Sequence, residues 1–137
     1  MPFSDHQNTM SLLSNEELVL HQLVYALNAM ERARQAIDER DVITAHNHIV
    51  LAENLIGELR GILPPGSQVD SILRPFYTMV IRRLFIANLT KKPGSLDDPI
   101  AGMSIMVDKW KQVIDYSRDM DRINVTEATH PATPRLK

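Results

Sequence analysis

Apolar residues recur along most of this chain at spacings of three and four, the period of an amphipathic α-helix rather than of a strand. Pro64-Pro65-Gly66 and Pro93-Gly94 interrupt the pattern, and Pro131 and Pro134 follow it. Because proline and glycine favour turns over helix interiors, these positions are expected to lie in loops or in a tail. The pattern therefore predicts helices joined by short connections.

The first helix is predicted from Asn15 to Glu39. Ser14 is a natural N-cap, and Glu17 completes a capping box in which each side chain accepts the other residue's backbone N–H. The apolar seam of this helix repeats in steps that match a heptad and consists of Leu20, Leu23, Leu27, Met30 and Ile37.

The second helix is predicted from Val42 to Ile62, with Asp41 as its N-cap. Its link to the first helix is so short that the two helices must be antiparallel neighbours. We expect its buried stripe to consist of Ala45, Ile49, Ala52, Ile56 and Leu59.

The third helix is predicted to open at Ser67, with Asp70 at its third position, and to end near Lys92. Pro75 lies inside this span and removes one backbone hydrogen bond. We therefore expect either a kink at Pro75 or a short helix followed by a longer one.

The fourth helix is predicted to begin at Ser95 or at Asp98, where Pro99 would take the favoured first helical position. It is expected to fade near Met120. Its seam is expected to consist of Met103, Val107, Trp110 and Ile114.

Four such helices with short loops predict an all-α fold, an antiparallel up-and-down four-helix bundle. A length of 137 residues fits one domain. We expect residues 1–13 to form an N-terminal flap that folds over one groove, residues 14–121 to form the bundle, and residues 122–137 to form a disordered tail.

Composition excludes several classes of protein. The chain has no cysteine, which removes disulfides, thiolate metal sites and cysteine catalysis. Its net charge of −2 lacks the basic excess of a typical nucleic-acid binder. The longest stretch without Asp, Glu, Lys or Arg is Leu18–Met30, which is shorter than the roughly 20 residues of a membrane span. Because the start also lacks the features of a secretory signal, a soluble cytoplasmic protein is expected.

The candidate catalytic and metal-binding residues are few. His46 and His48 are two residues apart, so on a helix they point about 200° away from each other and cannot share a metal ion. Glu17 and His21 share a face but make half a site, and the chain has no Glu-x-x-His pair, phosphate loop or G-x-S-x-G motif. We expect no metal site, no cofactor and no enzymatic activity.

The third helix carries apolar side chains on nearly every side, and Thr78, Arg82, Arg83 and Asn88 alone break the pattern between positions 76 and 89. A bundle helix needs an apolar stripe little wider than about 100°, so the surplus must be covered by another element. One candidate is the chain's own N-terminal segment, and the other is an amphipathic helix of a partner. The two are compatible if a partner displaces the flap, whose apolar residues are Phe3, Met10, Leu12 and Leu13.

The residues that we expect to contact a partner lie on the second and third helices. For each of them, packing in the core is the alternative, because the sequence does not determine which side of the helix faces inward. They are Leu51, Leu55, Tyr77, Val80, Ile81, Leu84, Phe85 and Asn88. The basic residues of the third helix are expected to form a solvated edge, with a docking patch for an acidic partner as the alternative; they are Arg74, Arg82, Arg83, Lys91 and Lys92.

The run from Phe76 to Leu89, FYTMVIRRLFIANL, resembles the signature helix of the FliS-type flagellin export chaperones, in which a Tyr, an Arg-Arg-Leu and an Ala-Asn-Leu recur at these spacings. The resemblance extends over roughly residues 5–115. Further similar segments are Gln7-Asn8, Ser14–Leu18, Ala45–Ile49, Ile56–Leu59 and Trp110. Two positions depart from the family pattern: Gln22–Tyr25 replaces a Leu-Tyr-Asp/Glu-Gly, and Asp5 replaces an N-terminal tyrosine.

The resemblance implies a cytoplasmic chaperone that binds the disordered C-terminal segment of monomeric flagellin as helices in hydrophobic grooves. Such a chaperone prevents premature polymerisation and keeps flagellin competent for type III flagellar export. It also implies the flagellar export apparatus as a second partner, and a monomer or weak dimer. The alternatives are a homodimeric assembly or regulatory subunit whose bare faces pair, and a divergent relative with another secreted client.

Overall fold

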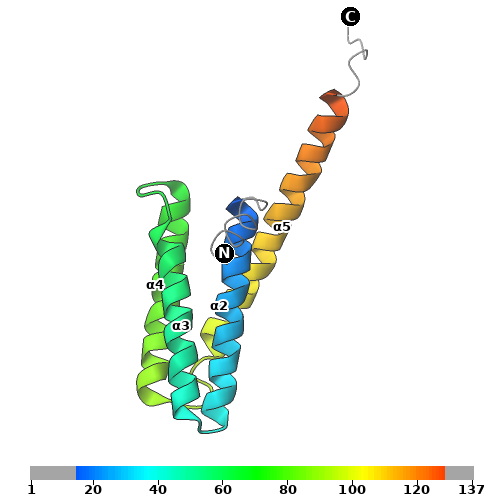
Figure 1. Cartoon of the computed structure of the whole chain (residues 1–137). Coiled ribbons are helices and arrows are strands. Elements are labelled where there is room, and N and C mark those ends of the chain that lie inside the picture. Colours follow the sequence, from blue (N-terminus) through cyan, green and yellow to red (C-terminus); the bar gives the residue numbers. More distant parts are fainter. Residues whose placement is uncertain (1–14, 129–137) are drawn as a thin grey trace, which may run out of the picture.

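The computed structural model describes the backbone of residues 15–128 and the side chains of residues 15–123. Within that range the chain forms four helices, α2 (Asn15–Asp38), α3 (Val42–Gly61), α4 (Gln68–Thr90) and α5 (Asp97–Ala128), and no strand. They run alternately up and down, with α3 beside both α2 and α4, and α5 beside α2 (Figure 1). The predicted antiparallel four-helix bundle is confirmed. The flap residues Phe3, Met10, Leu12 and Leu13, and the cap residue Ser14, lie outside the described residues.

The N-caps of α3 and α4 are those that the sequence predicts. The side chain of Asp41 accepts the backbone N–H of Thr44 at 3.1 Å, and that of Ser67 accepts the N–H of Asp70 at 3.0 Å. Helix α4 ends at Thr90 instead of Lys92 because Lys91 adopts a left-handed conformation, with φ of 51°. The first three helices therefore end within two residues of the predicted positions.

Helix α4 runs without interruption through Pro75, so of the two alternatives that the sequence leaves open, a short helix followed by a longer one is wrong. The carbonyl that loses its amide partner belongs to Ser71, one turn earlier. Ser71 and Pro75 are both exposed, so water can solvate the carbonyl on this side of the helix.

Helix α5 begins at Asp97, which makes Pro99 its third residue, and continues to Ala128. It therefore extends eight residues beyond Met120, and residues 122–128, expected in a disordered tail, are helical. The sequence contains no proline or glycine between Gly102 and Pro131, so no residue there breaks the helix. The last turns of α5 project past the other helices (Figure 1).

The tightest part of the bundle is the pairing of α2 with α3. Alanines make up half of the buried residues of these two helices, and small side chains let two backbones approach closely. They are Ala26, Ala29, Ala33 and Ala36 on α2, and Ala45 and Ala52 on α3. The predicted stripe of α3 is buried throughout, from Ala45 to Leu59.

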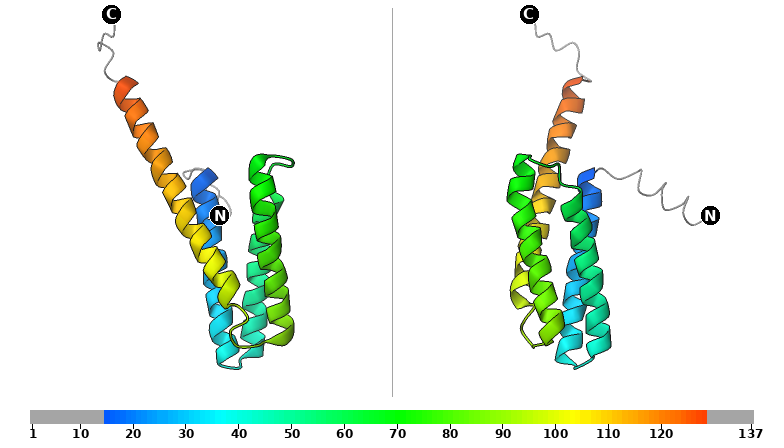
Figure 2. Two further views of the ribbon diagram at one scale, coloured as in Figure 1. Left: turned by 180° about the vertical axis from the view of Figure 1, so that it is seen from behind. Right: turned by 90° about the vertical axis from the view of Figure 1, so that its left-hand side faces the viewer.

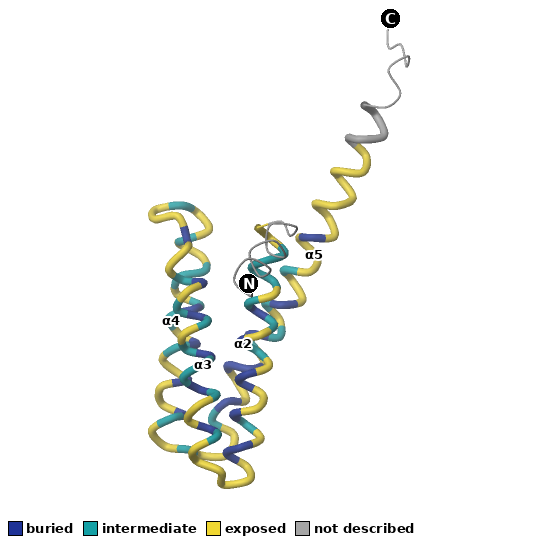
Figure 3. The backbone as a smooth tube through the Cα atoms, viewed as in Figure 1, coloured by how far each residue is buried: buried dark blue, intermediate teal, exposed yellow. Residues whose placement is uncertain are grey.

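Of the four pairs of adjacent helices, α4 and α5 make the least extensive contact, and the bundle opens between them toward the end where α4 begins (Figure 2). Helix α5 is attached to α2 instead. The indole Nε1 of Trp110 donates to the carbonyl of Glu16 at 2.8 Å, and Arg118 pairs with Glu17. After Arg118, the described residues of α5 are exposed on all sides of the helix (Figure 3).

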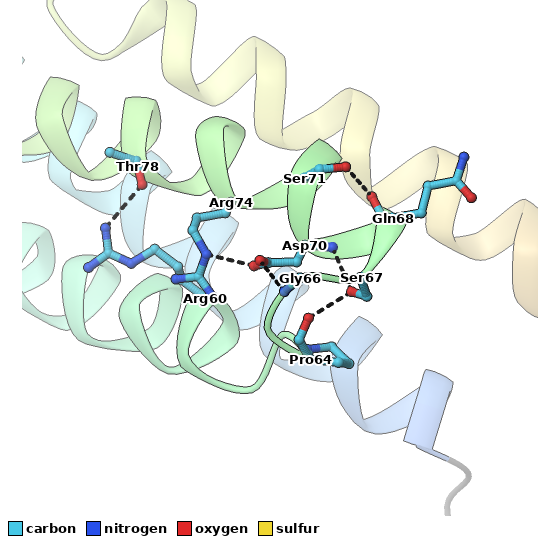
Figure 4. A network of polar contacts seen from close by, with 9 residues as sticks. All are labelled: Arg60, Pro64, Gly66, Ser67, Gln68, Asp70, Ser71, Arg74 and Thr78. Atoms are coloured by element: carbon cyan, nitrogen blue, oxygen red, sulfur yellow. Dashed lines mark hydrogen bonds and ion pairs between the residues drawn. The ribbon is translucent and has the colours of Figure 1, made fainter.

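The turn between α3 and α4 is fixed by hydrogen bonds that converge on Asp70 (Figure 4). Its Oδ2 accepts the backbone N–H of Gly66 at 3.1 Å, and its Oδ1 accepts Nε of Arg74 at 2.6 Å. Gly66 adopts a φ of 76°, a conformation that glycine tolerates without strain. The hydrogen bond from Gly66 and, after it, the one from Arg74 hold the pKa of Asp70 below its ordinary value.

This lowered pKa links the stability of the turn to pH. A carboxylate with a lowered pKa in the folded state stabilises the fold above its unfolded pKa and loses that contribution as pH falls through the folded value. We compare about pH 6, which lies above the ordinary pKa of Asp, with about pH 3, which lies below it. Between these two values we expect the free energy of unfolding to fall less for Asp70→Asn than for the wild-type protein. Urea denaturation at both pH values measures this, and equal losses in the two proteins would contradict it.

Candidate functional site

Helix α4 divides its apolar side chains between the core and the surface. Tyr77, Val80 and Leu84 are buried, together with Ala87. Three of the residues expected to contact a partner therefore pack inside the bundle, which is the alternative that the sequence leaves open for them. The burial of Tyr77 raises the pKa of its hydroxyl.

Asn88 contacts His46 and therefore lies at the border of α4 with α3. Ile81 and Phe85, seven and three residues earlier, lie on the same side of the helix by its period. We call these four residues the α3–α4 edge. Ile81 and Asn88 are partly buried, and Phe85 is 56% exposed. The Nδ2 of Asn88 lies 3.0 Å from Nδ1 of His46, and Nζ of Lys91 donates to Oδ1 of Asn88 at 2.8 Å. These polar contacts fix Asn88 beside an exposed aromatic ring.

Leu51 and Leu55 lie on the other side of α3, at its border with α2. We call this pair the α2–α3 edge. At 100° per residue, they point about 140° and 180° away from His46. The side chain of Gln22 on α2 donates to the carbonyl of Leu55 at 3.0 Å, which places this residue beside α2. The predicted contact residues therefore do not form one groove but lie on two sides of α3.

A pocket continues the α2–α3 edge toward the start of α2. Its volume is about 330 Å³ and its lining is mainly apolar. Leu59 of α3 and the C-cap residue Ile62 line one side of the pocket, and Leu18 and Val19 of α2 line the other. Gln22 bridges the two helices at this point by donating to Oε1 of Glu58 at 2.8 Å.

A third apolar surface lies between α4 and α5. Here Phe76 approaches Gly102, where an added Cβ would meet the ring at 3.4 Å. Leu73, Phe76 and Met106 are partly buried against the core. The sequence analysis did not select these residues, although a glycine within the seam of the fourth helix is a signal of close approach.

A fourth surface, which we call the α4 ridge, consists of Ile72, Met79 and Ile86. These exposed residues are seven positions apart and therefore share one side of the helix. Arg82 and Arg83, also exposed, flank the ridge. Leu89, 70% exposed, extends the apolar surface toward the end of α4.

The two histidines of α3 each contact a neighbouring polar group of the bundle. His48 Nδ1 lies 3.0 Å from the carbonyl of Thr44, and His46 contacts Asn88. Among the side chains that the structure describes, no group of three His, Asp or Glu residues is placed to hold a metal ion. Burial raises the pKa of Glu53 on α3, an effect that the nearby His46 partly offsets.

The sequence of this chain matches a known protein family. The family model for flagellar protein FliS matches residues 4–117. The chain belongs to the FliS family. It is also 28% identical over 112 residues to the flagellar secretion chaperone FliS of Bacillus subtilis (strain 168), a match that covers 82% of this chain and 84% of the relative. Membership of the FliS family makes this protein a flagellar secretion chaperone and gives no indication of catalysis.

No helix in the described part of this FliS-family chain is long and apolar enough to cross a membrane. Helix α5 extends to Ala128, and the family match ends at residue 117. The last turns of α5 therefore lie beyond the residues that the family model matches.

The division of α4 into buried and exposed residues predicts unequal effects of truncating two neighbouring side chains on the free energy of unfolding. We expect Leu84→Ala to lower the free energy of unfolding by about 2–5 kcal/mol, because it leaves a cavity in the core. Phe85→Ala should change it by only about 0.5 kcal/mol, because the ring is more than half exposed. Urea denaturation followed by circular dichroism measures both, and equal losses would contradict the assignment of Leu84 to the core.

Proposed function

We propose that this protein is a cytoplasmic chaperone that binds the disordered C-terminal segment of monomeric flagellin before type III flagellar export. The observation that carries the proposal is the apolar surface that α4 keeps after the bundle has formed. Phe85, Ile86 and Leu89 are each at least 47% exposed in the helix that carries the family signature. Soluble proteins rarely leave such patches bare unless they bind a partner.

The α3–α4 edge suits an amphipathic helix. Ile81 is partly buried, Phe85 is exposed beside it, and Asn88 supplies a polar group at the end of the apolar surface. A client helix would bury its apolar face against Ile81 and Phe85 and keep its polar face in water. The surface needs no change in the core, because Tyr77, Val80 and Leu84 already fill it.

The α2–α3 edge offers a second apolar surface at Leu51 and Leu55. Because the two edges lie on opposite sides of α3, one straight client helix cannot contact both. A flagellin segment that uses both edges has to pass around the bundle as separate helices. Such wrapping is typical of segments that are disordered before they bind.

This mode of binding explains how a chaperone can both hold and release its client. A segment that folds on binding pays for its ordering, so its affinity per unit of buried area is low. While bound, its apolar faces lie against the chaperone and cannot pair with other flagellin molecules. The free energy needed to release the client to the export apparatus, which we propose as the second partner, is therefore small.

The proposal is tested by titrating the protein with a peptide of the flagellin C-terminal segment. We expect a 1:1 complex by light scattering and a gain of helical circular dichroism as the peptide orders. Phe85→Glu should weaken binding by about tenfold or more, because it places a charge in the apolar contact.

Ile105→Glu is the matched control, because Ile105 has the same exposed fraction, 56%, but lies on α5. Both variants should keep the circular dichroism of the bundle. Equal loss of binding in the two variants would remove the α3–α4 edge from the site. Absence of binding by the wild-type protein would contradict flagellin as the client and favour another secreted client or a regulatory subunit.

A further inference from the structure

The outer side of α4 carries a heptad pattern that no other helix of the described chain covers. Helix α3 lies along one border of α4 and the start of α5 along the other, which leaves the side between them open (Figure 2). Each member of the α4 ridge is followed, three positions later, by another exposed residue. Together these six residues form what we call the α4 seam: Ile72, Pro75, Met79, Arg82, Ile86 and Leu89.

Alternating spacings of three and four are those of a coiled-coil seam, in which the side chains of one helix pack between those of a second helix. The two ends of the α4 seam are exposed, Ile72 by 63% and Leu89 by 70%. Between them the seam extends along about 25 Å of helix, which is the length of a partner helix of about 17 residues. The shape of the seam therefore fits one amphipathic helix.

Arg82 determines the charge that the partner must carry. It lies within the seam, exposed, between Met79 and Ile86. No described residue pairs with its guanidinium, and α4 carries no acid after Asp70. A helix packed on the seam would remove water from this cation, and a buried cation without a partner is strongly unfavourable. The partner helix therefore has to place an Asp or Glu opposite Arg82.

The other charged side chains of α4 near the seam do not neutralise Arg82. Arg83 lies beside the seam, is exposed and has no partner among the described residues. Asp70 points about 120° away from Arg82 around the helix and accepts Nε of Arg74. The outer side of α4 is therefore apolar and basic, which favours an acidic helix.

Two other occupants fit this surface less well. A second α4 could not pair with Arg82, because it has no acid along its own seam. Anionic membranes are recognised by clusters of about four to eight basic residues, whereas Arg82 and Arg83 supply two.

A helix on the seam would not overlap a client at the α3–α4 edge. At 100° per residue, the centre of the seam points about 110° away from the centre of Ile81 and Phe85. Two helices packed on α4 at an interaxial distance of about 9 Å would then have axes about 15 Å apart, which exceeds the helix width of about 10–12 Å. Both helices can therefore bind at the same time.

We propose that the α4 seam binds an acidic amphipathic helix of a second protein, with a carboxylate opposite Arg82, beside the client at the α3–α4 edge. The apolar members of the seam supply the buried area. Arg82 selects the partner, because a helix without an acid at this position would leave the cation buried and unpaired. The contact goes beyond the proposed binding of flagellin and does not depend on it.

Fluorescence anisotropy with a labelled designed peptide tests the proposal. The peptide has about three heptads, with leucine at the seam positions, one central glutamate in the seam, and flanking glutamates that keep it from pairing with itself. A control peptide carries lysine in place of each glutamate. The wild-type protein should bind the acidic peptide at least about tenfold more tightly than the control, and equal affinities would overturn the proposal.

A charge exchange at position 82 tests whether the contact uses the seam. Arg82→Glu should weaken binding of the acidic peptide by about tenfold or more and strengthen binding of the lysine peptide. Arg32→Glu is the matched control, because it changes the net charge equally but lies exposed on α2, and it should bind as the wild type does. Both variants should keep the circular dichroism of the bundle. Equal effects of the two substitutions would show that net charge alone drives binding and would overturn the proposal.

The same variant distinguishes the other occupants. A saturating flagellin peptide should leave the affinity for the acidic peptide unchanged, and the protein should not bind vesicles that contain phosphatidylserine. Displacement by flagellin, vesicle binding that Arg82→Glu abolishes, or a dimer that Arg82→Glu dissociates would assign the seam to the client, a membrane or a second copy, and each would overturn the proposal. Because the acidic peptide is first tested without flagellin, its failure to bind would leave the proposed client unaffected.

Discussion

A helix on the side of a bundle can bury only part of its circumference, and α4 carries apolar side chains on nearly all of it. The bundle buries Tyr77, Val80 and Leu84 in its core. What remains, from Ile72 to Leu89, faces water unless another molecule covers it. The binding surface that we propose on α4 follows from this surplus, because it consists of apolar side chains that the neighbouring helices leave exposed.

The fold could be predicted because its signals are local and redundant. The N-caps Asp41 and Ser67 each accept a hydrogen bond from a backbone N–H within three residues, and such short-range pairs are visible in the sequence. The stripe of α3 repeats at the helical period, so its buried side is determined by α3 alone. Helix α5 shows the limit of this reasoning. Its polar composition after Met120 suggests disorder, whereas the absence of proline and glycine before Pro131 permits a helix.

The candidate binding site could be predicted only in part, because it depends on where neighbouring helices lie. The sequence shows that α4 is apolar on most sides but does not show that α3 lies against the side of Asn88. Nor does it reveal that Leu51 and Leu55 lie beside α2, on the far side of α3 from His46. Phe76 and Gly102 are close only because α4 and α5 cross at that point.

The unequal packing of the four helices gives the fold a stable part and an accessible part. Helices α2 and α3 make the most extensive contact, and half of their buried residues are small alanines, so much of the core is secured by one hairpin. Helices α4 and α5 are each attached to one member of that hairpin and hardly to each other, so both keep exposed apolar sides. Had α4 and α5 also packed tightly, the partly buried residues between them, Leu73, Phe76 and Met106, would have stabilised a closed bundle. Because the hairpin secures so much of the core, the other two helices can expose apolar side chains while the chain remains folded.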